Sequence, residues 1–217
     1  MSTFPGSPHV IKGGIVLIDS LTAKVQRIIT LQYNPDTLSR TLQAQTISGD
    51  GKDRSQPMRL TGPPVETIKL EAEIDATDQM QLGDALTAQT GIYSQLAALE
   101  TIIYPTSAQL IANNNASKSG SLEIASIESA LTLFIWSKNR ILPVRITDFS
   151  VTEEAFDANL NPIRAKVSLG MRVLNIDDLG FDHKGGSLYM SYHQNKERLA
   201  GMFTRGNLNN FGITSIP

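Results

Sequence analysis

Cysteine is absent from the 217-residue chain. This absence excludes disulfide bridges, thiolate zinc sites and cysteine nucleophiles together. No uninterrupted apolar segment approaches the roughly 20 residues that a membrane-spanning helix needs, so the sequence predicts no direct insertion into a membrane. Hydrophobic residues make up 41% and charged residues 18% of the chain, which indicates a folded globular protein held together by packing alone.

Neither sign of charge dominates the sequence. Nineteen Lys and Arg residues stand against 21 Asp and Glu residues, and the net charge is -2. Without a basic excess, no nucleic-acid partner is expected. Residues 1–13 lack the apolar stretch of a secretory signal peptide, which predicts synthesis in the cytoplasm without such a signal.

Short β-branched and alternating segments dominate the first 175 residues and predict a mainly β, α+β fold. Residues 15–18 form a short buried strand after Gly13-Gly14, and residues 24–33 alternate in a second strand. The turn signal Asn34-Pro35-Asp36 leads into a third strand over 37–47. We expect these three strands to form a meander.

Later segments predict longer strands. Residues 65–75 alternate between an apolar face and a polar face, and residues 163–173 alternate in the same way. Residues 130–137 and 139–152 are separated by so few residues that a tight hairpin is expected. Together these strands predict a β-barrel or sandwich.

Helical and irregular segments interrupt the strands. Apolar residues at three- to four-residue spacing predict one flanking helix over 91–104. Glycine, proline and charge predict a long loop over 48–64, and low complexity predicts an exposed, mobile loop over 113–121. We expect one domain over 1–175 and a short, partly helical C-terminal tail over 176–217.

No motif indicates catalysis, a metal site or a cofactor. Acid/base chemistry needs paired carboxylates in contrasting environments, whereas Glu71, Glu73 and Asp75 share one strand face and Asp78 follows it. The histidines lie far apart, at His9, His183 and His193, without the spacing of a zinc site. The segment 49–52 lacks the rest of a phosphate-binding loop. We therefore expect a protein that is not an enzyme.

Two surfaces have more than one interpretation. Phe134 and Trp136 face the same way, either as core residues, which is the commoner case, or as a stacking platform for a ligand. Arg164, Lys166 and Arg172 form a basic strand face opposed in sign to the face of residues 67–75. These two faces can be solvated surface, intramolecular partners or complementary subunit contacts.

Four segments, read in order, resemble the tube protein family of contractile injection systems, the phage-tail-like particles that include the antifeeding prophage and the Photorhabdus virulence cassette. The resemblance covers about residues 10–175. The segments are Ile28-Ile29-Thr30-Leu31-Gln32-Tyr33-Asn34-Pro35 with Leu38-Ser39-Arg40; Gly62-Pro63-Pro64-Val65-Glu66-Thr67-Ile68-Lys69-Leu70; Leu142-Pro143-Val144-Arg145-Ile146; and Glu153-Glu154-Ala155-Phe156-Asp157 with Leu160-Asn161-Pro162-Ile163-Arg164-Ala165.

The resemblance implies a tail-tube-like barrel or sandwich that assembles into a six-fold ring of identical chains. The ring is expected to be a tube initiator or adaptor in a baseplate, between a central spike protein of the VgrG type and the inner tube proteins, with baseplate wedge or sheath components as further partners. The particle is then either released or anchored at a membrane. Many relatives carry a C-terminal LysM domain, and residues 175–217 show no clear LysM pattern.

We expect the long loop, between residues 49 and 64, to make contacts between subunits or layers. Its candidate interface residues are Gly49, Asp50, Lys52, Arg54, Pro63 and Pro64. The expected lumen face is polar, and its candidate residues are Lys69, Glu71, Glu73, Arg164, Lys166 and Arg172. Two alternatives stay open: a phage or prophage tail-tube or tail-completion protein, and a carbohydrate- or small-ligand-binding β domain that uses Phe134 and Trp136.

Overall fold

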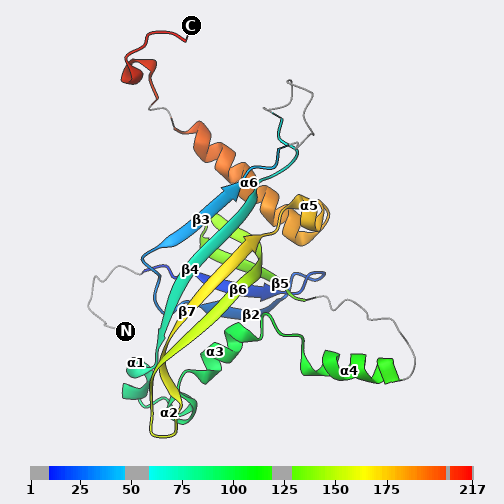
Figure 1. Ribbon diagram of the computed structural model, residues 1–217, viewed down its shortest axis with the longest axis vertical. Helices are drawn as coiled ribbons and strands as arrows, with labels where there is room; N and C mark the ends of the chain where they lie inside the picture. Colours follow the sequence, from blue (N-terminus) through cyan, green and yellow to red (C-terminus); the bar gives the residue numbers. More distant parts are fainter. Residues whose placement is uncertain (1–9, 47–58, 119–128, 204–205, 217) are drawn as a thin grey trace.

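The computed structural model describes residues 10–46, 59–118, 129–203 and 206–216, and within them one antiparallel sheet of seven strands forms the body (Figure 1). The strand order is β2-β1-β5-β6-β7-β4-β3. The strands are β1 (Gly14–Ile18), β2 (Val25–Thr30), β3 (Leu38–Gln43), β4 (Val65–Asp75), β5 (Leu131–Ser137), β6 (Arg140–Phe156) and β7 (Pro162–Val173). The predicted hairpin between β5 and β6 is confirmed, because Ser137 pairs with Arg140.

Helices fill the connection between β4 and β5 and the C-terminal part of the chain, so the protein is α+β as predicted. They are α1 (Thr77–Gln81), α2 (Ala85–Thr90), α3 (Tyr93–Glu100), α4 (Ser107–Lys118), α5 (Ile176–Leu179) and α6 (Lys184–Gly201), with a 3-10 turn, η1, at Leu208–Phe211. The expected single flanking helix corresponds to α3, and α1, α2 and α4 accompany it. Residues 113–118, predicted to be a mobile loop, belong to α4, and residues 119–121 lie outside the described part.

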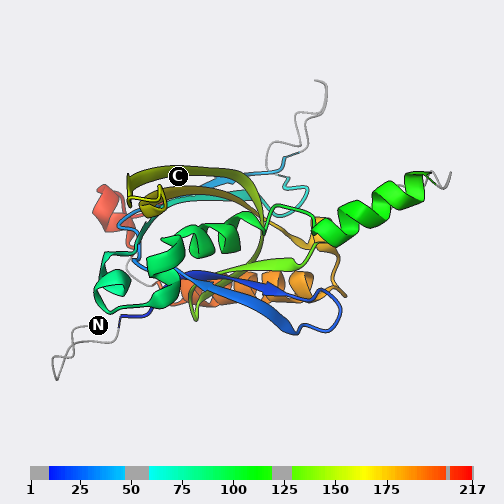
Figure 2. The ribbon, with the colours of Figure 1, turned by 90° about the horizontal axis from the view of Figure 1, so that it is seen from below.

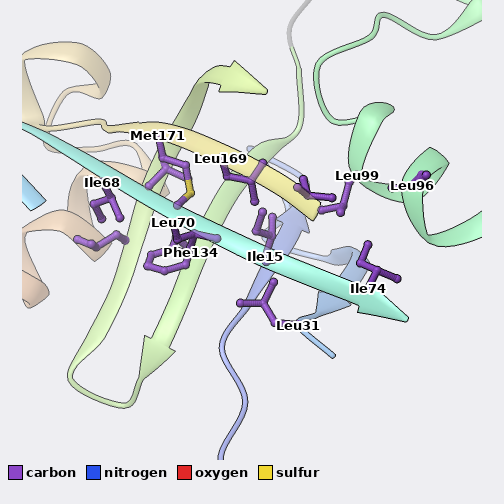
Figure 3. Close-up of a cluster of buried hydrophobic side chains, with 14 of the residues drawn as sticks. Ile15, Leu31, Ile68, Leu70, Ile74, Leu96, Leu99, Phe134, Leu169 and Met171 are labelled. Atoms are coloured by element: carbon purple, nitrogen blue, oxygen red, sulfur yellow. The ribbon is translucent and has the colours of Figure 1, made fainter. Parts of the chain in front are cut away.

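The sheet curves around α3, and the core lies between them (Figure 2). Along β4 the burial alternates as the sequence predicts, with Ile68 and Leu70 buried and Lys69 and Glu71 exposed. Figure 3 shows β4 and β7 side chains packing with residues of β1, β5 and α3. The cluster includes Ile15, Leu31, Ile74, Leu96, Leu99, Phe134, Leu169 and Met171.

The predicted meander of the first three strands is wrong. β2 pairs with β1 but not with β3, and β3 pairs with β4 at the opposite edge of the sheet. On its other side β1 pairs with β5, with Ile15 opposite Phe134. Strand alternation specifies which face is buried but not which strand lies beside which, so the order along the chain gave the wrong neighbour.

The helical part of the predicted tail packs against the sheet. Tyr189 and Tyr192 of α6 are buried in the same core as the strands. Before them, Asn175 caps α5 in a reciprocal capping box with Asp178. The segment 176–201 therefore contributes to the packed body, while the division of the chain at residue 175 stays a prediction.

Candidate functional site

The six residues predicted to form a polar lumen face lie on one face of the sheet. β4 and β7 are antiparallel neighbours, with Glu73 opposite Lys166 and Asp75 opposite Arg164. Since side chains in a strand alternate between faces, the same register brings the remaining predicted residues to that side. Lys69, Glu71, Glu73, Arg164, Lys166 and Arg172 point away from the apolar core, and Arg172 is the most covered of them.

Two cations of this polar face are paired with carboxylates of the same chain. Arg164 Nε lies 2.9 Å from Asp75 Oδ2, and Lys166 Nζ lies 3.1 Å from Glu154 Oε1 on β6. Hydrogen bonds from Thr77, followed by the guanidinium of Arg164, hold the pKa of Asp75 below its usual value. The two strand faces of opposite charge had three interpretations: solvated surface, intramolecular partners or subunit contacts. The structure supports intramolecular partners on a solvent-exposed surface.

Arg172 leaves the strand face toward the C-terminal part of the chain. Its Nη2 donates to both carboxylate oxygens of Asp178, at 2.9 Å and 3.2 Å. Asp178 also closes the capping box of α5. The Asp178 side chain therefore links the end of β7 to the start of the C-terminal helices.

Both edge strands of the sheet lack a further strand partner within the described residues, and the outward side of β2 lines a groove toward the end of β4. β2 lies at one edge and β3 at the other, and β3 pairs only with the first part of β4, from Val65 to Leu70. The backbone N–H of Leu31 donates to the carbonyl of Gly13, so these two residues form a hydrogen-bonded pair. Hydrogen-bonded and non-hydrogen-bonded pairs alternate along an antiparallel ladder, so Ile28 points its N–H and C=O away from β1. Its side chain is 67% exposed. A free, partly apolar edge can pair with a strand of another chain.

A groove of about 400 Å³ separates β2 from the unpaired end of β4, beside α3. Gln32 spans it through hydrogen bonds to the backbone of Asp75. Gln95 of α3 also lines the groove, and its Oε1 is buried without a hydrogen-bond partner. The gap is thus narrow enough to be bridged by one side chain.

A buried polar cluster that the sequence did not predict joins β3, β4 and α6. Glu66 is 3% exposed, and its Oε1 accepts from Arg40 Nε at 2.8 Å. Its Oε2 accepts from Lys196 Nζ at 3.2 Å, and Tyr192 OH donates to Oε1 at 3.3 Å. Lys196 Nζ also lies 4.2 Å from the centre of the Tyr192 ring. A carboxylate on the apolar face of β4 was the available sequence signal, but its partners are remote in the chain.

Only part of the predicted interface loop can be placed. Gly49, Asp50, Lys52 and Arg54 lie outside the described residues. Pro63 and Pro64 are half-buried directly before β4. The loop contact therefore stays a prediction.

The other candidate residues lie apart from one another. His183 caps the start of α6 by accepting from the N–H of Gly185, and His193 lies 3.3 Å from Glu197 on the surface of that helix; His9 lies outside the described residues. Glu71, Glu73 and Asp78 are exposed. Among the residues that the structure describes, no group of three or more His, Asp or Glu side chains is placed to hold a metal ion.

The aromatic pair belongs to the core. Phe134 is 1% exposed and stacks on Trp136, with ring centroids 5.9 Å apart. Trp136 is itself partly buried against the core cluster. This packing favours the structural interpretation of the pair over a ligand platform.

Comparison of the chain with protein-family models and with curated protein sequences gives no match. In the described part of the chain, no helix combines the length and the apolar character needed to cross a membrane.

Proposed function

We propose that this chain is a structural subunit of a contractile injection system baseplate. In this proposal the curved sheet is a tail-tube-like barrel or sandwich, and the chain forms a hexameric initiator or adaptor ring between the central spike and the inner tube. The chain is made in the bacterial cytoplasm and is incorporated into a phage-tail-like particle. The class of protein proposed here comes from the ordered resemblance of residues 10–175 to the tube protein family.

The observation that carries the proposal is a curved sheet whose two edge strands lack a further strand partner within the described residues, with one polar face on which Arg164 and Lys166 are ion-paired. β2 and β3 are different surfaces, so a contact between β2 of one chain and β3 of the next is head-to-tail. Repeated head-to-tail contacts generate a ring when the rotation closes. In such a ring the polar face supplies a wetted lumen wall to which a passing protein would not adhere.

Edge pairing is tested with a substitution that removes one outward hydrogen-bond donor. Ile28→Pro deletes an N–H that points away from β1, so it blocks pairing with a neighbouring chain while sparing the β1 ladder. Ile28→Thr is the matched control, because it removes the apolar side chain and keeps the N–H. Circular dichroism of both variants checks that the fold is retained.

The measurement is the mass of each purified protein, alone and mixed with the spike protein. We expect six-membered rings from the unsubstituted chain and from Ile28→Thr, and monomers from Ile28→Pro. A chain that stays monomeric both alone and with the spike contradicts the ring. Rings formed equally well by Ile28→Pro contradict the role of the β2 edge.

A further inference from the structure

A groove of about 530 Å³ lies between α5 and the connection from α3 to α4 (Figure 1). It opens where β6 continues past β5, because the last pair that joins these two strands at this end is Thr132 with Val144. Its volume is within the range of small-molecule sites, about 300–1,000 Å³. The apolar side chains that line it include Ile102, Ile103, Leu131, Val144, Ile146 and Leu179.

One cation lines this groove, and no carboxylate does so among the described residues. The cation is Arg145, which follows Val144 and therefore lies beside Leu131, on the same face of the sheet. Its guanidinium makes no hydrogen bond or ion pair with another described residue. Arg172, its neighbour on β7, is paired with Asp178 instead. An unpaired cation beside apolar walls favours a ligand that is anionic at one end and apolar along the rest.

A second hydrogen-bond donor lines the groove at the start of α6. His183 Nδ1 accepts from the N–H of Gly185 at 3.0 Å, so the proton of the neutral imidazole is on Nε2. This Nε2 makes no hydrogen bond with another described residue. His183 therefore adds a neutral donor to a groove whose charge comes from Arg145.

The wall at the start of α6 is closely packed. A Cβ at Gly185 would clash with Leu179 and would lie 3.3 Å from Leu131 Cδ1. A Cβ at Gly186 would clash with the carbonyl oxygen of Gly180. The two glycines let α6 begin directly against the β5 end of the groove, so this wall is formed before a ligand binds. A preformed site loses little conformational entropy on binding.

We propose that this groove binds one medium-chain aliphatic carboxylate per chain. The carboxylate pairs with Arg145 and accepts from His183, and the hydrocarbon chain lies against the apolar walls. A free inorganic anion would leave those walls uncovered, and a sugar would find no Trp, Tyr or Phe to stack on among the described lining residues. None of these lining residues belongs to β2 or β3, so the site is separate from the edges used in the proposed ring and goes beyond the proposed function.

Calorimetric titration of the full chain with decanoate tests the site. We expect one site per chain, with a Kd on the order of 10–100 μM. Decylamine, which has the same chain length and the opposite charge, and acetate, which has no chain, should each bind at least about tenfold more weakly. Equal binding of decanoate and decylamine would show adsorption to apolar surface only and would overturn the proposal, as would the absence of saturable decanoate binding.

Substitutions separate the two ends of the ligand. Arg145→Gln should weaken decanoate binding about tenfold, whereas Lys138→Gln, the matched loss of one charge at the β5–β6 turn outside the groove, should leave the Kd unchanged. Arg145→Glu should bind decylamine in preference to decanoate. Ile103→Ser should also weaken decanoate binding, and because this side chain is 48% exposed we expect the fold to be retained. Circular dichroism without ligand checks each variant. An unchanged Kd in either Arg145→Gln or Ile103→Ser overturns the proposal.

A carboxylate beside an apolar group also ends a polypeptide chain, so N-acetyl-leucyl-leucine serves as a second probe. Tighter binding of this peptide than of decanoate would assign the groove to a chain terminus and overturn the proposal. The mass of the protein with and without decanoate keeps the outcome apart from the proposed function. Six-membered rings without decanoate binding refute the ligand site alone, and decanoate binding by a chain that never forms rings refutes the ring alone.

Discussion

Gln32 takes the place of a strand partner for Asp75. Its Oε1 accepts from the Asp75 N–H at 2.9 Å, and its Nε2 donates to the Asp75 carbonyl at 2.7 Å. β4 continues past its last pairing with β3 at Leu70, so among the described residues no strand pairs with its final residues on that side. One side-chain amide therefore bridges the gap between the residues after β2 and the end of β4, where backbone pairing stops.

Replacing Gln32 by Ala removes both of these hydrogen bonds. At about 0.5–1.5 kcal/mol for each bond, we expect the free energy of unfolding to fall by about 1–3 kcal/mol. Urea unfolding measures the change. Gln43→Ala, at an exposed position on β3, is the matched control and should have little effect. Equal losses for the two variants would refute the bridging role of Gln32.

Replacing Glu66 by Gln leaves Arg40 and Lys196 without their carboxylate. Removing one partner of a fully buried pair costs about 3–5 kcal/mol. Both cations keep some contact with solvent, so we expect a smaller loss, about 2 kcal/mol. Hydrogen exchange should rise first in the second half of α6. Glu71→Gln, on the polar face, is the control, and unchanged exchange in α6 would contradict the link.

Gly91 lies at the turn between α2 and α3, where φ is +56° and an added Cβ would lie 2.2 Å from the carbonyl oxygen of Pro162. Gly91→Ala should therefore destabilise the protein by about 3 kcal/mol, through backbone strain and displacement of the β7 start. Gly83→Ala is the matched control: its φ is +75° but the space around it is open, so only the left-handed cost of about 1–2 kcal/mol applies. Thermal unfolding of both variants checks the order, and an equal loss in both would remove the steric explanation.

Asp157, in the turn between β6 and β7, makes the stability of the protein depend on pH. Hydrogen bonds from the side chain and then the backbone of Asn161 hold its pKa below the ordinary value. A lowered folded-state pKa gives stabilisation that is present above the unfolded-state pKa, about 4, and is lost as pH falls through the folded-state pKa. Asp157→Asn should therefore flatten the decline of the unfolding midpoint below about pH 4. Asp36→Asn, an exposed aspartate in a turn, is the control, and identical slopes for Asp157→Asn and the natural chain would contradict this role.

The sequence predicted which face of a strand is buried, but it did not predict which strands lie next to each other in the sheet. Ile68 and Leu70 alternate with polar residues, so one side of β4 had to be buried. The position of β1 between β2 and β5 depends on the pairing of Ile15 with Phe134, which periodicity alone does not encode. α4 was missed for a related reason: it has no buried residues, so its sequence carries little apolar period.

Part of the candidate site was also within reach of the sequence. Glu73 and Lys166 were assigned to strand faces of opposite charge, and β4–β7 pairing makes them neighbours on one face of the sheet. The Glu66 cluster was out of reach, because Lys196 lies on a helix 130 residues further along the chain. The conformation of the β6–β7 turn was not predicted, because the positive φ of Leu160 goes with hydrogen bonds to Asp157 rather than with a glycine.

The place of β1 in the sheet also sets when the body can form during synthesis. β1 is an inner strand whose second neighbour, β5, begins more than one hundred residues later. On the ribosome, the β1–β2 hairpin must therefore wait, with one side unpaired, until most of the chain has emerged. Closing so long a loop slows folding, and the waiting strand is then exposed to premature association with other nascent chains.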